Sequence, residues 1–379
     1  MKNPIQELHR AIALVQDPYT HKSLADADFI KELKYQAGKV SLVVYLYYPG
    51  NFVREMLEHA LRERLMALDF VQQLKVSIQH IIRAKRPQNG IKKLPNIKNI
   101  IAVASGKGGV GKSTVAANLA VSLAAAGAKT GLLDADIHGP SQTKLFSVQY
   151  HGKAALKDEK YLLPMTVFGV EIMSIALIAP ENTPLIWRGP MVTNALKQML
   201  FYTVWDMLDY LIIDMPPGTG DIQLTLSQKI PVTGAVIVTT PQDVALLDVR
   251  KSIQAFHKLH VPVIGIVENM SYHICEQCQH KSFILGQGGG EQLVKEFKTD
   301  MLGKLPLSSD IYASGEAGIP MTSAIYPAKK SAAHLTTAAQ KYHHKDLIAM
   351  YQDIAIKTAL NTARLDNAEE QIIDVVHQD

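Results

Sequence analysis

The pattern of apolar and polar positions in the first part of the chain predicts a small α+β domain over residues 1–82. Three stretches carry apolar residues at helical spacing. Another stretch is rich in β-branched and aromatic residues, which favours a strand. The expected helices are residues 6–15, 52–66 and 70–82, and the expected strand is residues 40–48.

From residue 99 onward, short apolar runs alternate with helical segments, and this pattern predicts an α/β domain over residues 99–330. Such alternation is typical of a mostly parallel, doubly wound sheet with helices on both faces. Ligands of such sheets bind beyond the carboxyl ends of the strands. The expected strands are residues 100–105, 130–134, 210–214, 234–240 and 263–269, and a helix at 113–126 follows the first.

Two further segments complete the predicted organisation. Residues 83–98 contain proline, glycine and six positive charges without an acidic residue. A solvated, basic linker is favoured there over a contact with nucleic acid or an anionic membrane. Residues 331–379 are expected to be a helical C-terminal extension with an acidic end.

Composition narrows the class of protein. The chain has 379 residues, 47% of them hydrophobic and 20% charged, which is ordinary globular usage. A net charge of +4 gives no reason to expect a nucleic-acid partner. The start of the chain does not resemble a secretory signal, and no apolar run approaches the ~20 residues that span a bilayer. A cytoplasmic protein without a membrane partner is therefore expected.

One glycine-rich segment carries the strongest chemical prediction. The segment from Gly106 to Ser113 matches G-x-x-x-x-G-K-[ST] between an expected strand and helix. Its backbone N–H groups and the helix N-terminus would bind phosphate, Lys112 would reach the β- and γ-phosphates, and Ser113 would ligate Mg²⁺. The predicted nucleotide-binding residues here are Gly106, Lys107, Gly108, Gly109, Val110, Gly111, Lys112, Ser113 and Thr114.

Acidic residues end two of the expected strands. Asp134 and Asp136 follow one strand, and Asp214 ends another. Carboxylates near a triphosphate are repelled unless Mg²⁺ offsets their charge, so these residues indicate metal or water binding. The alternative for Asp134 and Asp136 is a pair of residues that only form a turn. Asp214 is the candidate Walker B aspartate, so Ser113 and Asp214 are the Mg²⁺ ligands expected from the residues alone.

The segment after Asp214 has the composition of a nucleotide-sensing loop. It reads M-P-P-G-T-G-D, so that prolines stiffen one side and glycines can turn their N–H groups toward a γ-phosphate. Loss of that phosphate would release the loop. The expected switch II residues are Pro217, Gly218 and Gly220.

Two other residues are candidates for a base pocket. The amide of Asn269, at the end of an expected strand, can donate to and accept from an adenine edge. A turn asparagine is nearly as well supported by the sequence. Pro306 is a second candidate for lining the pocket.

The only cysteines, Cys275 and Cys278, form a C-x-x-C pair, which excludes a disulfide framework. Structural zinc and [4Fe–4S] clusters usually have four protein ligands. Two chains could supply four thiolates to one cluster. Alternatively, His273 and His280 could complete a zinc site within one chain, or the pair could be a redox dithiol.

Several of these motifs resemble known families. The run K-G-G-V-G-K-S resembles the deviant Walker A motif of the MinD/ParA/nitrogenase-iron-protein superfamily. This resemblance implies a homodimer that sandwiches two nucleotides, with Lys107 contacting the partner's nucleotide. It also implies that Asp136 positions the attacking water, that Asp134 supports it or the Mg²⁺ shell, and that Asn269 contacts the base.

The run N-M-S-Y-x-x-C-x-x-C, together with D-I-H-G-P-S and D-M-P-P-G-T-G-D, resembles the Mrp/ApbC family of iron–sulfur cluster carrier ATPases over residues 97–326. The stretch A-L-V-Q-D-P resembles the MIP18-like (DUF59) domain that precedes many of them. The resemblance implies a slow ATPase that uses ATP and Mg²⁺. It also implies a labile [4Fe–4S] cluster, bound by Cys275 and Cys278 across a homodimer and transferred to apo-proteins, with cluster scaffold proteins as further partners.

Two other functions remain open on the sequence. A MinD/ParA-like positioning ATPase would need a membrane-binding tail or a basic DNA surface, whereas the acidic end of this chain would be repelled by anionic lipid. A zinc-stabilised regulatory NTPase is the other alternative.

Overall fold

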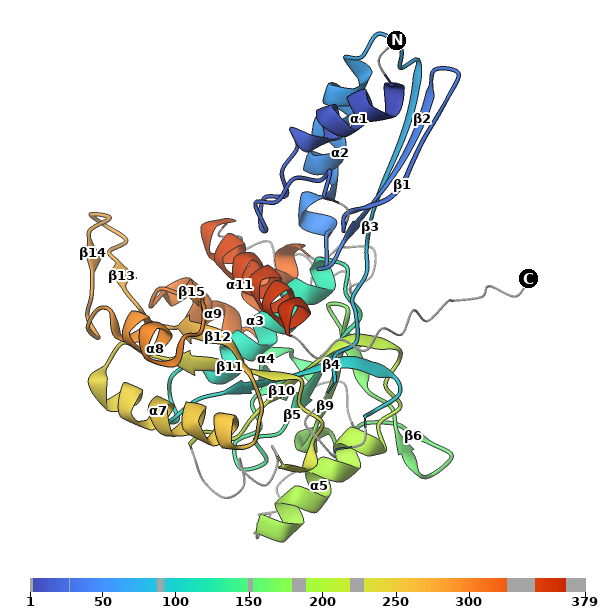
Figure 1. The fold of residues 1–379 in the computed structure, drawn as a ribbon. Coiled ribbons are helices and arrows are strands. Elements are labelled where there is room, and N and C mark those ends of the chain that lie inside the picture. Colours follow the sequence, from blue (N-terminus) through green and yellow to red (C-terminus); the bar gives the residue numbers. More distant parts are fainter. Residues whose placement is uncertain are drawn as a thin grey trace. The chain divides into compact units, whose positions relative to one another are not determined.

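The computed structural model describes residues 3–26, 28–86, 91, 93–148, 153–178, 189–218, 228–325 and 345–365. The chain divides into two compact units, Met1–Ile82 and Arg83–Asp379 (Figure 1). Each unit has its own sheet.

The first unit packs two helices against one face of a three-stranded sheet. Strands β1 and β2 are antiparallel, while β2 and β3 are parallel and are joined by a crossover through α2. The core lies between the sheet and the helices. It contains every second residue of β2, such as Leu42, and the inner face of α2, such as Leu57 and Leu61, and these three residues are fully buried. The elements are α1 (Pro4–Ala13), β1 (Ile30–Gln36), β2 (Lys39–Leu46), α2 (Asn51–Met66) and β3 (Gln73–His80).

The expected helix at residues 70–82 is wrong, because strand β3 occupies this segment. Its sequence Q-L-K-V-S-I-Q-H alternates polar and apolar positions, and Val76 and Ile78 are buried while Ser77 between them is more exposed. A period of two residues places one side of a strand on the core. Val76 pairs with Leu42 of β2, which fixes this register.

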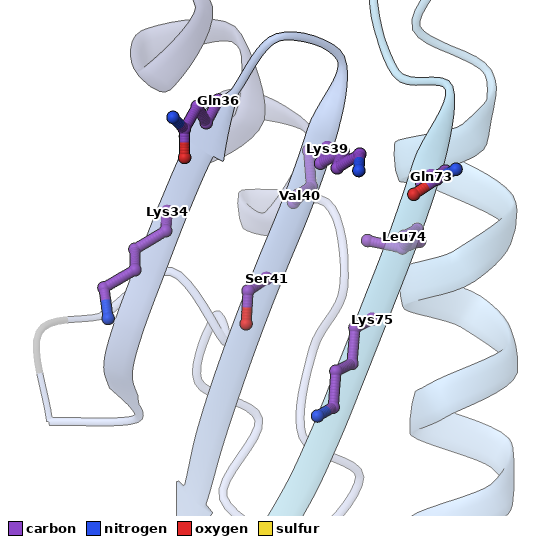
Figure 2. Close-up of a pocket in the computed structure, with 8 residues that line it drawn as sticks. All are labelled: Lys34, Gln36, Lys39, Val40, Ser41, Gln73, Leu74 and Lys75. Atoms are coloured by element: carbon purple, nitrogen blue, oxygen red, sulfur yellow. The ribbon is translucent and has the colours of Figure 1, made fainter.

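The open face of this sheet is polar and slightly hollowed, with a volume of about 430 Å³ (Figure 2). Figure 2 shows Lys34, Lys39 and Lys75 standing on three neighbouring strands. None of the residues predicted to carry chemistry lines this hollow, so we interpret it as a solvated sheet face. Its lining consists of Lys34, Gln36, Lys39, Val40, Ser41, Gln73, Leu74 and Lys75.

The second unit is built on an eight-stranded sheet with the order β15-β12-β11-β4-β10-β5-β9-β8. Neighbouring strands are parallel except β8, which is antiparallel to β9. The predicted α/β fold with a mostly parallel, doubly wound sheet is therefore confirmed. The strands are β4 (Ile97–Ala104), β5 (Thr130–Asp134), β8 (Met165–Val167), β9 (Val170–Ser174), β10 (Leu208–Asp214), β11 (Gly234–Thr239), β12 (Val263–Glu268) and β15 (Met301–Lys304).

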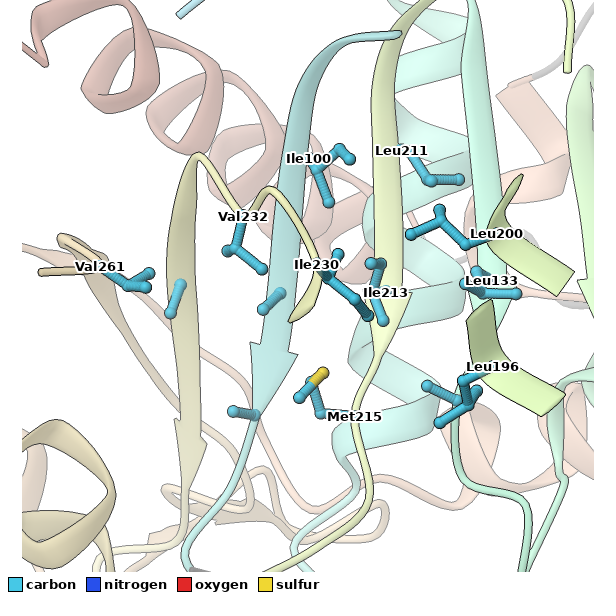
Figure 3. Packing of buried hydrophobic residues seen from close by; sticks show 14 of the residues in the cluster. Ile100, Leu133, Leu196, Leu200, Leu211, Ile213, Met215, Ile230, Val232 and Val261 are labelled. Atoms are coloured by element: carbon cyan, nitrogen blue, oxygen red, sulfur yellow. The ribbon is translucent and has the colours of Figure 1, made fainter. Parts of the chain in front are cut away.

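Helices cover both faces of this sheet. On one face, Figure 3 shows Ile100, Leu211 and Ile213 of the central strands directed toward Leu196 and Leu200 of α5. On the other face, α3 packs on β5 and β10, and α11 packs on α3. The helices are α3 (Lys112–Ala125), α4 (Gln142–Leu145), α5 (Gly189–Phe201), α7 (Asp243–Lys258), α8 (Gly289–Phe297), α9 (Ser309–Glu316) and α11 (Lys345–Arg364), with short 3-10 turns η2 (Ile175–Leu177) and η3 (Met321–Ile325).

Two short hairpins project from this framework. One is formed by β6 (Leu156–Lys157) and β7 (Tyr161–Leu162), and the other by β13 (His273–Ile274) and β14 (Lys281–Ser282). The second hairpin carries the cysteine pair between its strands.

Helix α11 belongs to the core of the second unit, although residues 331–379 are expected from sequence to be an extension. Its Tyr351, Ile354 and Ala355 are buried against neighbouring elements. At its end, the buried ammonium of Lys85 donates to the carbonyl oxygens of Ala363 (2.7 Å) and Leu365 (2.8 Å). Lys85, expected in a solvated linker, therefore caps a helix C-terminus, where positive charge is favourable.

Candidate functional site

The predicted phosphate loop lies between β4 and α3, at the carboxyl end of the central strand. Close packing explains two of its glycines. A Cβ on Gly106 would lie 2.4 Å from the backbone nitrogen of Val249 in α7. Gly111 has a φ of +82°, and a Cβ there would lie 2.2 Å from Nδ2 of Asn269. A loop packed this closely keeps its backbone N–H groups next to the helix N-terminus, which suits an anion.

Lys112, the first residue of α3, forms an ion pair with Asp214 at the end of β10. The lysine side chain is 6% exposed and the aspartate is fully buried. The ammonium also lies 3.3 Å from Oγ of Ser113. The structure thus brings together Lys112 and Ser113 of the phosphate loop and Asp214, which were predicted from two separate motifs. Removing one partner of a buried pair is costly, because the other charge is left uncompensated.

Gln142, at the start of α4, is a site residue that the sequence analysis missed. Its Nε2 donates to Oδ2 of Asp214 (2.8 Å) and to the carbonyl oxygen of Ser113 (3.0 Å), while its backbone N–H donates to Asp134 (3.1 Å). The side chain is fully buried, and within the described residues its Oε1 has no hydrogen-bond partner. Gln142 directly follows the D-I-H-G-P-S run, which was the available sequence signal.

Asp134 ends β5, where it pairs with Asp214 of β10, and Asp136 follows two residues later. Asp134 is fully buried and accepts from Oγ of Ser174 (3.2 Å) and from the N–H of Asp136 (3.2 Å). Burial and the charge of Asp214 raise the pKa of Asp134 to about 8. Burial also raises the pKa of Asp136. Asp134, Asp136 and Asp214 thus act electrostatically on one buried ammonium, that of Lys112. Within the described residues these three carboxyl groups do not gather tightly enough to hold a metal ion, so binding of Mg²⁺ by Asp134 and Asp214 stays a prediction.

The predicted switch II segment begins beside the phosphate loop. The N–H of Met215 donates to the carbonyl oxygen of Val103 (3.0 Å), and the N–H of Gly218 donates to that of Ser105 (3.1 Å). Pro217 is exposed and faces Gly108. Gly220 lies outside the described residues.

Lys107 and Thr114 lie at the two ends of the loop. Lys107 is half-buried, and its ammonium lies 3.4 Å from Oε1 of Gln242, the residue before α7. Thr114 is half-buried in the first turn of α3, one position after Ser113. The proposed contact of Lys107 with a partner's nucleotide stays a prediction.

The two candidate base-binding residues follow neighbouring strands β12 and β15. Asn269 is 7% exposed, and its Nδ2 donates to the carbonyl oxygen of Val110 (2.9 Å) in the phosphate loop. Pro306 is buried just beyond β15. Both residues lie at the carboxyl edge of the sheet, and their contact with a base stays a prediction.

Cys275 and Cys278 occupy the tight turn between β13 and β14. The N–H of Cys275 donates to the carbonyl oxygen of His280 (3.0 Å), and the N–H of Gln279 donates to that of Cys275 (2.9 Å). Both thiols are free; Cys275 is half-buried and Cys278 is exposed. Hydrogen bonds from the backbones of Cys278 and Gln277 lower the pKa of Cys275. Its thiolate, the form that binds metal, is therefore favoured.

The within-chain zinc site receives no support from the described residues, where no three His, Cys, Asp or Glu side chains gather to hold a metal ion. His273 instead has its Nδ1 3.2 Å from the carbonyl oxygen of Leu307. Several apolar side chains are exposed on the hairpin that carries the cysteines or beside it. They are Ile274, Phe283, Ile284 and Leu307, the last of which forms a β-bridge with His273.

The sheet, the phosphate loop and the buried Lys112–Asp214 pair define a P-loop nucleoside triphosphatase. A family model described as "NUBPL iron-transfer P-loop NTPase" matches residues 96–343, and one described as "Iron-sulfur cluster assembly protein" matches residues 5–78. The chain belongs to the NUBPL iron-transfer P-loop NTPase family. Within the described residues, none of the helices combines the length and apolar character required to cross a bilayer.

Similar proteins agree with this family. A protein of Pseudomonas fragi named iron-sulfur cluster carrier protein is 53% identical over 253 residues, 67% of this chain and 88% of its own. A protein of Haemophilus influenzae with the same name is 43% identical over 319 residues, 84% and 85% of the two chains. A solved nucleotide-binding protein of Archaeoglobus fulgidus, in complex with ADP, is 38% identical with a TM-score of 0.52, covering 59% of this chain and 87% of that one. The expected resemblance to iron–sulfur carrier ATPases is confirmed.

Proposed function

We propose that this chain is an ATP-hydrolysing iron–sulfur cluster carrier. In this proposal a labile [4Fe–4S] cluster binds between two copies of the chain and is transferred to apo-proteins in the cytoplasm, with cluster scaffold proteins as further partners. The observation that carries the proposal is the projecting hairpin, which presents the free thiols of Cys275 and Cys278 on the same unit as the phosphate loop.

The number of thiols supports a shared cluster. One chain offers two cysteines, whereas a [4Fe–4S] cluster is held by four thiolates. A two-fold axis through the hairpin would bring two pairs together, since the same patch meets itself in such a dimer. Ile274, Phe283 and Ile284 beside the cysteines are exposed apolar side chains that an interface would bury.

The nucleotide site supports ATP hydrolysis. In the proposed ATP complex, Lys112 and the loop N–H groups bind the phosphates, while Ser113, Asp134 and Asp214 hold Mg²⁺, directly or through water. Bound Mg²⁺ would neutralise charge that develops on the phosphates. Asp136 would orient the attacking water.

Three further residues would complete the bound state. Lys107 would contact the nucleotide of the partner subunit, and Asn269 and Pro306 would contact the base. Lys107 is half-buried next to α7 and takes no part in the Lys112–Asp214 pair. Its ammonium is therefore near the surface, as a contact across an interface requires.

Anaerobic reconstitution with iron and sulfide tests the proposal. Wild type should gain broad absorbance near 400 nm and about one [4Fe–4S] cluster per dimer. The Cys275→Ala/Cys278→Ala variant should gain neither and should hydrolyse ATP like the wild type without cluster. Stoichiometric zinc without iron uptake, or iron uptake by the double variant, would refute the carrier function.

A further inference from the structure

Glu268, the last residue of β12, is a buried carboxylate to which the proposed nucleotide chemistry assigns no role. It is 1% exposed, and among the described residues no lysine, arginine or histidine forms an ion pair with it. A buried charge of this kind is expensive unless hydrogen bonds satisfy it. Its two oxygens therefore need specific donors.

Both donors belong to the segment that carries the cysteines. Oε1 of Glu268 accepts from the hydroxyl of Ser271, where this segment begins. Oε2 accepts from the N–H of Gly290 (2.6 Å), where the segment ends in the first turn of α8. The N-terminus of a helix favours negative charge, which adds to this second contact. One carboxylate thus ties together both ends of residues 271–290.

The neighbouring residue ties the same strand end to the phosphate loop. Asn269 donates to the carbonyl oxygen of Val110, and its Nδ2 fills the space that a Cβ on Gly111 would need. Between the two contacts, Met270 has a φ of +53°, an uncommon conformation for this residue type. This turn lets Asn269 face the phosphate loop while Ser271 returns to Glu268.

We propose that Glu268 is a positioning residue for the cysteine pair, and that it links the thiols through Asn269 to the occupancy of the phosphate loop. Nucleotide in the loop shifts Val110 and Gly111, Asn269 follows, and Glu268 passes the shift to both ends of the hairpin segment. The inference rests on the proposed function, because it assigns the thiols as the cluster ligands.

The test measures alkylation of the two thiols in the full-length, cluster-free protein. The chain has only two cysteines, and fragmentation of the peptide that contains both assigns the alkylation of each one. Rates are measured at one pH, with and without a non-hydrolysable ATP analogue and Mg²⁺. Glu268→Gln is compared with Glu296→Gln, the same change on α8 at an exposed residue that pairs with Arg250 (2.8 Å).

In wild type and in Glu296→Gln, nucleotide should change the alkylation rate of at least one thiol on the order of fivefold, the low end of typical coupling between sites. In Glu268→Gln the ratio should fall to about one, while fluorescence titration still detects nucleotide binding. The proposal would be overturned if nucleotide changed the alkylation rate in Glu268→Gln as much as in the wild type. It would also be overturned if nucleotide had no effect on alkylation of the wild type. If Glu268→Gln only loosens the loop, alkylation becomes faster both with and without nucleotide, and the ratio of the two rates stays as in the wild type. That result also counts against the proposal.

Ser271→Ala provides a second variant if Glu268→Gln does not fold. It removes one of the two donors to Glu268, so an intermediate ratio is expected and an unchanged ratio overturns the proposal. Reconstitution of the wild type separates the two proposals. A nucleotide effect without cluster binding would remove the carrier function alone, and cluster binding without a nucleotide effect would remove the positioning role alone.

Discussion

The ammonium of Lys112 and the carboxylate of Asp214 meet in the interior of the second unit, joining the first residue of α3 to the last residue of β10. Asp214 also accepts from Gln142, whereas the lysine has Ser113 as its other neighbour. In the nucleotide-free protein this pair offsets the charge of both groups. ATP and Mg²⁺ would therefore have to compete for each partner when they bind.

Lys112→Met should destabilise the nucleotide-free protein by about 3–5 kcal/mol, because Asp214 is left buried without a cation. The double variant Lys112→Met/Asp214→Asn should recover most of this loss and should still fail to bind ATP. Urea denaturation measures the stability, and calorimetric titration measures the binding. Equal stability of Lys112→Met and wild type would show that the pair contributes little.

Gln142→Ala should weaken the use of Mg²⁺ more than it weakens nucleotide binding. The variant removes the amide that contacts Asp214 and Ser113, and loss of one buried partner costs about 1–3 kcal/mol. The Mg²⁺ concentration for half-maximal ATPase activity should rise about tenfold. Gln142→Glu should be worse, since it adds a further carboxylate to Asp134 and Asp214. A normal Mg²⁺ dependence in both variants would place Gln142 outside the site.

Gly111→Ala and Gly109→Ala form a matched pair of variants. Both glycines have a positive φ, +82° and +80°, so each alanine costs about 1–2 kcal/mol in backbone conformation. Only Gly111→Ala also collides with Asn269. Apart from the adjacent residues, no atom of the described residues lies within 4 Å of a Cβ added at Gly109. The melting temperature of the nucleotide-free protein should fall further for Gly111→Ala, and adding Asn269→Ala should restore part of the difference. Equal melting temperatures would contradict the close approach of Asn269.

The buried hydroxyl of Tyr48 donates to the fully buried carboxylate of Asp17 in the first unit. Burial and this carboxylate raise the pKa of Tyr48. Because the pKa of Tyr48 is higher in the folded than in the unfolded state, its protonated hydroxyl contributes fully to stability below the unfolded-state pKa of about 10. This contribution is lost as the pH rises above that pKa.

Thermal unfolding between pH 8 and pH 11 should therefore show a transition that weakens from about pH 10 upward. Tyr48→Phe should lower stability at neutral pH by only about 1–2 kcal/mol, because Asp17 keeps its contacts with Tyr19 and Thr20. The variant should also flatten the alkaline dependence, because it removes the ionisable hydroxyl. Tyrosinate absorbance near 295 nm provides an independent measure of ionisation. An unchanged alkaline profile in Tyr48→Phe would assign the effect to other tyrosines.

The parts of the site that the sequence predicted are those in which local chemistry and strand order agree. The phosphate loop could be predicted because its glycines, lysine and serine are contiguous, and Asp214 because an apolar strand ends on it. Gln142 and Glu268 could not be predicted in this way. Their roles depend on hydrogen bonds to residues that are distant in sequence or that lie at the far end of a loop.

The error at residues 70–82 has a different origin. Val76 and Ile78 are two positions apart, which places them on one side of a strand but on different sides of a helix. The local alternation therefore already favours β3, and pairing with β2 completes it. Lys85 was assigned to a solvated linker on composition alone, since the carbonyl groups that it caps lie almost at the other end of the chain. Sequence patterns describe local preference, whereas Lys85 is placed by long-range contacts.

The place of α11 in the second unit has a consequence for synthesis on the ribosome. This helix covers α3, the helix that opens with Lys112, yet it spans Lys345–Arg364 in a chain of 379 residues. The first unit can complete its sheet early, because all its strands are translated by His80. The second unit keeps an uncovered α3 until α11 has emerged from the ribosome. Nascent chains should therefore acquire protease resistance in two steps, the second of them only after Arg364 has left the ribosome.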